Sequence, residues 1–285
     1  MDDSEEPEDG RGTTGERFSS FTKRNLVLVA VFFLSNLLTA VSTLVTAVTV
    51  LGESQKDWRA AEYRKLRELR AGYTLEKFQK ELGPPVFRTS LEPGSALVRN
   101  VYRPREQYWV EAISNKTNAA VTYAVTTCDP TFRPEFFFEG NGRRHRVVLN
   151  KTTLSEALPA QEQRDESLKI FFGGTGSSDN FVFHVYGHGG GTNYRTFAWG
   201  LNDTCPTWHA KSPGYDPQSS WGKWYQEHRP AEDPPGHFFL AEKLDEGARD
   251  IMAESVVNTY AETAFARDMS TYYPNQIGVS RLVVA

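Results

Sequence analysis

The chain reads LRAGYTLEKFQKELGPP from Leu69 to Pro85, and this stretch specifies a short helix together with both of its ends. Thr74 is a good N-cap, because its side-chain oxygen can accept a hydrogen bond from a free backbone N–H of the first turn. Leucine and phenylalanine then recur at helical spacing and provide one apolar face. Gly83 can adopt the left-handed conformation that closes a helix, and Pro84 prevents the helix from continuing.

Three strand-like runs follow the short helix, at Leu97–Tyr102, Tyr108–Ser114 and Ala119–Thr126. Short polar loops separate them, and consecutive strands with short connections favour an antiparallel meander. On the other side of the quoted stretch, residues 53–70 are rich in strong helix formers and predict a first helix. We therefore expect an α+β fold, in which residues 53–130 form a unit of two helices and three antiparallel strands.

Upstream of this unit lies a run of 27 residues without a charge, residues 25–51. About 20 apolar residues suffice to cross the hydrocarbon core of a bilayer, so the run predicts one transmembrane helix. A cleaved signal peptide is the alternative, but its apolar region would be shorter, about 7–15 residues. Residues 1–24 are acidic and predict a disordered tail. These features together predict a single-pass protein of the plasma (inner) membrane, with the lipid bilayer as one partner.

Five hydroxyl side chains share one face of the predicted transmembrane helix, at spacings of four and three residues: Ser35, Thr39, Ser42, Thr46 and Thr49. Small hydroxyl residues let two helices approach closely in lipid and bond to each other, which predicts packing against another helix or self-association. Alternatively, the hydroxyls bond to carbonyl groups of their own helix. Both interpretations stay open.

The pattern Leu-x-x-Gly-x-Thr, a short helix and then Leu-Gly-x-Pro resembles the small domain of the BamE/SmpA/OmlA outer-membrane lipoproteins. The resemblance covers about residues 55–128 and rests on turn and cap positions, namely Leu69, Gly72, Thr74, Leu82, Gly83 and Pro84. It implies two helices against a three-stranded antiparallel sheet, a superfold that is doubled in tandem in the β-lactamase inhibitor protein. It extends to bacterial proteins with one N-terminal span. Those lipoproteins carry a lipidated cysteine near the N-terminus, where this chain has the predicted span, so a role in outer-membrane assembly does not carry over.

Residues 131–206 form a second strand-rich unit, which is either a repeat of the first unit or an unrelated extension of one sheet. Both units end in an aromatic-Ala strand followed by Thr-Cys, at Cys128 and Cys205. If the units are copies, the two cysteines occupy equivalent positions and could form a disulfide. Two buried, reduced thiols are the alternative. Because a disulfide needs an oxidising compartment, this pairing favours an extracytoplasmic location of the folded domain.

Residues 207–285 are expected to begin with a loop rich in proline and aromatic residues and to continue as a helix from about Ala241 to Arg267. Trp221, Trp224 and Tyr225 lie in the loop region, close to several cationic side chains. Such aromatic residues could serve as contacts for a protein partner. The alternative is that the tryptophans cover the sheet or the last helix as ordinary core.

Composition limits the function. With 36 acidic and 32 basic residues, the chain has no concentrated basic charge, so no nucleic-acid partner is expected. We find no catalytic constellation and no cofactor or metal motif, so neither catalysis nor a cofactor is expected. The leading prediction is a membrane-anchored domain that binds or scaffolds another protein through a sheet face or edge. Two alternatives stay open: an envelope enzyme or small-ligand receptor using the Gly-rich region 173–191 with His184 and His188, and a homo-oligomeric membrane sensor.

Overall fold

The structure is a computed structural model, and it describes a defined part of the chain. The described residues are 37, 39–43, 58–91, 94–140, 142–158, 168–173, 181–188, 195–205, 208–228, 237–240, 244–264 and 276–281. The chain divides into two compact units, residues 1–60 and residues 61–285. In the first unit, the described residues are helical. Apart from the hydroxyl side chains of residues 35–49, the features described below belong to the second unit.

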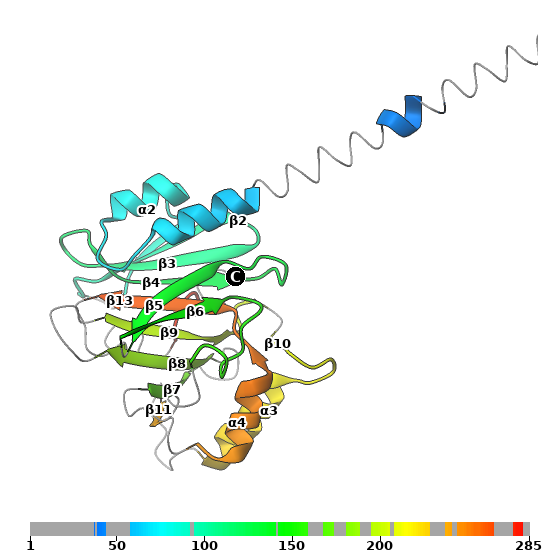
Figure 1. The fold of residues 1–285 in the computed structure, drawn as a ribbon. Helices are drawn as coiled ribbons and strands as arrows, with labels where there is room; N and C mark the ends of the chain where they lie inside the picture. The colour runs from blue at the N-terminus through cyan, green and yellow to red at the C-terminus, as the bar shows by residue number, and fades with distance from the viewer. Residues whose placement is uncertain are drawn as a thin grey trace, which may run out of the picture. The chain divides into compact units, whose positions relative to one another are not determined.

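A nine-stranded antiparallel sheet dominates the second unit (Figure 1). In spatial order the strands are β1 (Phe87–Ser90), β2 (Val98–Arg105), β3 (Tyr108–Ser114), β4 (Ala120–Thr127), β13 (Thr259–Ala264), β9 (Arg195–Asn202), β8 (Phe181–His188), β7 (Leu168–Gly173) and β11 (His237–Leu240). The central strand, β13, comes from the C-terminal part of the chain and pairs with β4 on one side and β9 on the other. Two meanders, β2–β4 and β7–β9, are thereby joined into one sheet.

The two faces of the sheet carry different side chains at the central strands, because successive residues of a strand point to opposite faces. We call one of them the aromatic face; the register places on it Tyr102, Tyr123, Tyr260, Trp199 and Tyr186. On the opposite face, the three central strands align alanines in direct register, Ala124, Ala261 and Ala198. All of these side chains are buried.

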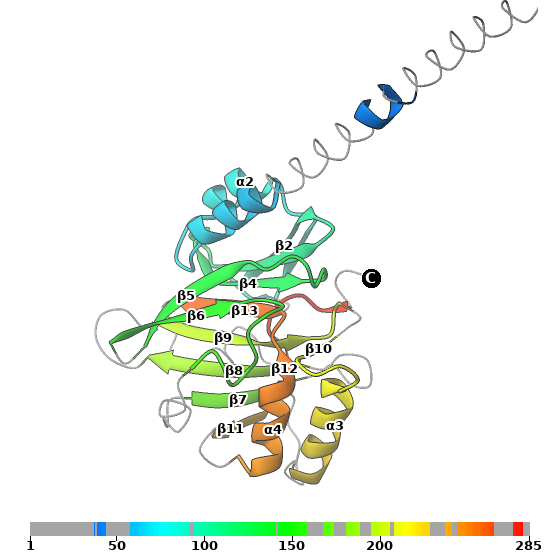
Figure 2. The same cartoon turned by 45° about the vertical axis from the view of Figure 1, so that its right-hand side comes forward.

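Helices and a β-hairpin cover the aromatic face (Figures 1 and 2). Helix α2 (Leu75–Leu82) packs Phe78 against Tyr102 and Tyr123, with ring centroids 6.4 and 5.8 Å apart. The hairpin of β5 (Glu135–Gly140) and β6 (Arg143–Val148) stacks Phe136 on Tyr260 at 4.4 Å. The core of this layer is therefore largely aromatic.

A buried carboxylate fastens the helical residues 61–68 to the same face. Tyr108 donates a hydrogen bond of 2.6 Å to Glu62, and the Lys65 ammonium and Arg105 guanidinium lie 2.9 and 3.4 Å from its other oxygen. Burial raises the pKa of Glu62, but these three donors outweigh burial and hold the pKa below its usual value. The carboxylate is therefore ionised at neutral pH although it is almost fully buried.

Helices α3 (Pro217–His228) and α4 (Glu246–Glu254) lie side by side near the β7 and β11 end of the sheet (Figure 2). Asp216 and Asp245 cap their N-termini, accepting hydrogen bonds from the backbone N–H groups of Ser219 and Ala248 at 3.2 and 2.8 Å. A small second sheet pairs β10 (His209–Ala210) with β12 (Ser255–Val256), directly after α4.

The predicted fold class is wrong. The structure is not a helix-helix-three-strand unit, single or duplicated, but one large antiparallel sheet with few helices. The strands of the first meander and the bounds of α2 are confirmed. Thr74 stands at the N-cap of α2, but its side chain makes no capping hydrogen bond. The C-terminal part is where the prediction fails: the expected helix Ala241–Arg267 ends at Glu254, and the chain continues as β12 and β13. Residues 217–228, expected to be a loop, form α3.

The prediction of a transmembrane helix at residues 25–51 is also corrected. Crossing a bilayer takes about 20 apolar residues in one helix. Throughout the part of the chain that the structure describes, no helix combines that length with that apolarity. This finding contradicts the prediction of a single-pass plasma-membrane protein. Most of residues 25–51 lie outside the described residues; the exceptions, Leu37 and residues 39–43, are helical.

Candidate functional site

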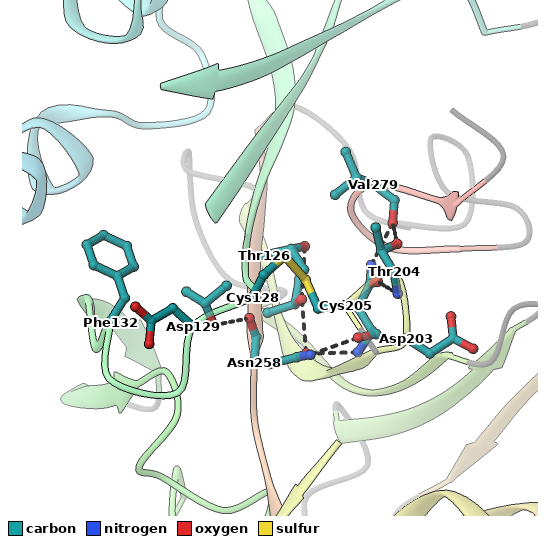
Figure 3. The surroundings of a disulfide bond; sticks show 12 residues. Thr126, Cys128, Asp129, Phe132, Asp203, Thr204, Cys205, Asn258 and Val279 are labelled. Carbon is teal, nitrogen blue, oxygen red and sulfur yellow. Dashed lines mark hydrogen bonds between the residues drawn. A yellow bond between two sulfur atoms is a disulfide. The ribbon is translucent and has the colours of Figure 1, made fainter. Parts of the chain in front are cut away.

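Cys128 and Cys205 form a disulfide, with their Cα atoms 5.0 Å apart (Figure 3). The predicted pairing is confirmed. Cys128 directly follows β4, and Cys205 lies three residues after β9. Because these two strands flank β13, the disulfide joins their ends across the start of the central strand.

Asn258 connects the same three strands by hydrogen bonds (Figure 3). Its carbonyl oxygen accepts from the N–H and the hydroxyl of Thr127 at 2.9 and 3.0 Å. Its side-chain amide accepts from the Asn202 N–H at 2.9 Å and donates to the Asn202 carbonyl at 2.7 Å. The Asn202 side chain then donates to the carbonyls of Ile277 and Val279, both at 2.9 Å. Because these groups are hydrogen-bonded to one another, the region around the disulfide holds the ends of the three strands together and has a structural role.

The predicted partner contacts Trp221, Trp224 and Tyr225 lie on α3 and pack on the sheet. Their ring centroids are 5.4, 5.5 and 5.0 Å from that of Phe172 in β7. Trp221 and Trp224 are buried, and the indole of Trp221 donates a hydrogen bond of 3.0 Å to Ser255. This packing favours the interpretation of the tryptophans as core.

His184 lies in β8 on the aromatic face, fully buried against Trp199. Burial lowers the pKa of His184 to about 3, so its imidazole is neutral at physiological pH. The side chain of His188 and residues 174–180 and 189–194 lie outside the described residues. Within the described ranges, no group of three or more His, Cys, Asp or Glu could hold a metal ion.

We expect His184 to make the stability of the protein depend on pH. The unfolded chain protonates this imidazole near pH 6.5 and the folded chain only near pH 3, so between these values the unfolded state binds more protons. The free energy of unfolding therefore falls as the pH falls below 6.5, by about 2 kcal/mol between pH 7 and pH 5. Urea unfolding at both pH values checks this against His184→Phe, which cannot titrate. Identical pH dependence in the two proteins would contradict the prediction.

The hydroxyl stripe of the predicted span is described only in part. Ser35, Thr46 and Thr49 lie outside the described residues, whereas Thr39 and Ser42 are helical and exposed. Next to them, Thr43 donates a hydrogen bond of 2.6 Å to the Thr39 carbonyl. Thr43 is not one of the five predicted residues, so both interpretations of the stripe stay predictions.

Among the described residues, one edge of the large sheet has no further strand beside it. Strand β1 stands at the end of the strand order, and the side chains of Phe87–Ser90 are all exposed. Leu91 continues the register by donating its N–H to the Leu97 carbonyl at 3.0 Å. Because backbone bonds alternate along an antiparallel pair, the N–H and C=O groups of Arg88 and Ser90 point away from β2, toward the open side.

The side chains at this edge are apolar and cationic. Val86 and Phe87 are 52% and 41% exposed. Arg88 follows them, and it takes part in none of the ion pairs found among the described residues. Within the described part of the chain, the edge therefore offers backbone groups that point away from β2, two exposed apolar side chains and a guanidinium outside any ion pair.

A cavity of about 500 Å³ lies over the aromatic face, beside β5. Its lining combines three arginines, two glutamates and three phenylalanines: Arg70, Arg144, Arg195, Glu139, Glu262, Phe137, Phe138 and Phe197. Sequence reasoning found neither the cavity nor the β1 edge, because both depend on which distant segments the fold brings together or leaves uncovered.

No family model matches the chain, and no curated protein or solved structure matches it either. The class that the fold defines is a large antiparallel-sheet domain with one disulfide across its central strand. The functional argument therefore rests on the geometry of the edge and the cavity.

Proposed function

We propose that the chain is a protein-binding domain, which takes up an extended segment of another protein as an additional strand beside β1. The open edge carries the proposal, because strand addition needs unpaired backbone N–H and C=O groups in a row. Arg88 and Ser90 present such groups on the open side of β1. Main-chain hydrogen bonds then supply affinity, and alternate side chains supply specificity.

The side chains of β1 indicate the chemistry of the added segment. Phe87 and Thr89 point to one face of the sheet, and Arg88 points to the other. A partner strand would therefore place an apolar residue near Phe87 and a carboxylate near Arg88, since opposite charges favour cross-strand pairs. Two antiparallel copies of β1 would instead bring two Arg88 guanidinium groups close together within a four-residue strand. This repulsion favours a different protein over a second copy of the chain.

A short, charged edge strand is also how proteins avoid unwanted pairing. The exposed Val86 and Phe87 distinguish β1 from such a protected edge, because a protected edge gains nothing from two large apolar side chains in water. A protected edge would bind no extended segment, whereas a binding edge would.

We expect an extended peptide of alternating valine and glutamate to bind the full chain, and one of alternating valine and lysine to bind more weakly. Arg88→Glu should reverse this preference, changing each affinity about fivefold, because one exposed charge pair is exchanged for a repulsion of similar size. Fluorescence anisotropy of labelled peptides measures both affinities. Ser90→Pro should weaken both peptides, since it removes an outward N–H and leaves the bonds to β2 in place.

Arg249→Glu is the matched control, because it makes the same charge change on an exposed position of α4. A preference that Arg88→Glu leaves unchanged would overturn the proposal. The proposal would also be overturned if Arg249→Glu changed the two peptide affinities as much as Arg88→Glu does. Dimerisation of the chain alone would overturn it too, if Ser90→Pro abolished that dimerisation.

A further inference from the structure

We propose that the cavity beside β5 binds a small zwitterion, an amino acid or dipeptide with an apolar side chain. This inference is independent of strand addition at β1. It rests on three kinds of groups that the lining brings together: a buried carboxylate, two arginines that form no ion pair among the described residues, and a cluster of phenylalanines.

The cavity is assembled from segments far apart in the sequence. Arg70 lies just after the helical residues 58–68, Glu139 and Arg144 face each other across the β5–β6 hairpin, and Glu262 belongs to the central strand. Its volume of about 500 Å³ falls within the range of small-molecule sites, roughly 300–1,000 Å³. The size suits one amino acid or dipeptide.

Glu262 provides the position for a cation. The side chain is 1% exposed, and one oxygen pairs with the Arg195 guanidinium. The other oxygen, Oε2, is buried and has no hydrogen-bond partner among the described residues. A buried carboxylate oxygen without a donor is costly, so an ammonium group of a ligand would be favoured beside it.

Arg70 and Arg144 provide the position for a carboxylate. Arg70 donates a hydrogen bond of 2.9 Å to the Leu69 carbonyl. Arg144 lies over the Phe137 ring, 4.0 Å from its centroid. Neither guanidinium is in an ion pair with a carboxylate within the described part of the chain. Each guanidinium has five N–H donors in a planar fork, which suits a carboxylate.

The phenylalanines provide the apolar part of the lining. Phe138 and Phe197 are buried with ring centroids 5.2 Å apart, and the Phe137 ring lies under the Arg144 guanidinium. A ligand with only a negative charge would leave Glu262 Oε2 without a donor. A ligand with only a positive charge would leave Arg70 and Arg144 without an anionic partner. A zwitterion with an apolar side chain satisfies all three parts of the lining.

Three ligands with the same phenylethyl body separate these cases: L-phenylalanine, 3-phenylpropionate and 2-phenylethylamine. Isothermal titration calorimetry with the full chain should show L-phenylalanine binding at least tenfold more tightly than either singly charged analogue. A parallel titration with L-leucyl-L-phenylalanine tells whether the cavity prefers a dipeptide to an amino acid. Equal or tighter binding of 3-phenylpropionate would overturn the proposal, and so would the absence of binding by both zwitterions at 10 mM, roughly the weak limit of a specific small-molecule site.

Two variants assign the binding to the cavity. Arg144→Gln should weaken L-phenylalanine about tenfold, whereas Arg146→Gln should leave it unchanged. Arg146 lies on the same hairpin, is paired with Glu135 and does not line the cavity, so it controls for charge. Equal losses in the two variants would overturn the proposal. Glu262→Gln should lower the affinity for L-phenylalanine to that for 3-phenylpropionate. If this buried substitution prevents folding, the comparison of Arg144→Gln with Arg146→Gln still tests the proposal.

Discussion

Replacing both cysteines, in the double variant Cys128→Ala/Cys205→Ala, is expected to lower the free energy of unfolding by about 4 kcal/mol. The two residues are 77 positions apart, so the unfolded chain without the disulfide gains the freedom of a long open loop. In the folded chain, the same bond holds the ends of β4 and β9 together across β13. Guanidinium unfolding of the oxidised protein and of the variant measures the difference.

Dithiothreitol supplies the control for this prediction. The reductant should bring the stability of the oxidised protein down to that of the double variant and should leave the variant itself unchanged. A difference below about 1 kcal/mol would mean that the unfolded chain is not constrained by the disulfide, contrary to the loop-entropy argument.

Gly200→Ala is expected to destabilise the protein by about 3 kcal/mol, because β9 and β8 approach too closely for a side chain there. An added Cβ at Gly200 would overlap the backbone oxygen of Val182 and lie 2.7 Å from the Cα of Phe183. Both atoms belong to the backbone of β8, which is held between β9 and β7 by antiparallel pairing. The strand cannot shift without loss of these hydrogen bonds, and thermal unfolding should show a lower midpoint.

Gly222→Ala is the matched control for Gly200→Ala. Gly222 lies within α3, and an added Cβ meets nothing within 4 Å. Alanine is the better helix former, so this substitution is expected to raise stability by roughly 0.5–1 kcal/mol. Similar shifts in the two variants would show that close strand contact is not the cause.

Local chemistry made parts of the fold predictable. Helix α2 has the predicted bounds because its signals lie within a few residues of each other: Thr74 precedes it in extended conformation, and Gly83 ends it with φ of 85°. The first meander has strands within a few residues of those predicted, since its loops are short and polar. The disulfide was one of two alternatives for the cysteines, and it was derived from a duplication that the fold does not contain.

The last part of the sheet was not predictable in the same way. Val256 and Tyr260 are four residues apart and fit a helix that continues α4, yet Tyr260 lies in the central strand. Residues 259–264 are fully buried between β4 and β9, whose edges supply hydrogen bonds on both sides. Tertiary pairing of this kind outweighs a local helical pattern, because propensities differ by only about 1 kcal/mol per residue or less.

The candidate sites were the least predictable features. Arg70, Arg144, Arg195 and Glu262 are unremarkable charges in the sequence, and only the fold places them around one cavity. Likewise, Phe87 and Arg88 become a binding edge only because no further strand pairs with β1 in the described sheet.

By itself, the sequence determined the short helix and the first three-strand meander, since each depends on interactions between residues close together in the chain. Only the tertiary structure decided which strand lies at the centre, which edge stays open and which charges meet. Those outcomes depend on pairing between distant segments, whose free energy is absent from any local stretch of the chain.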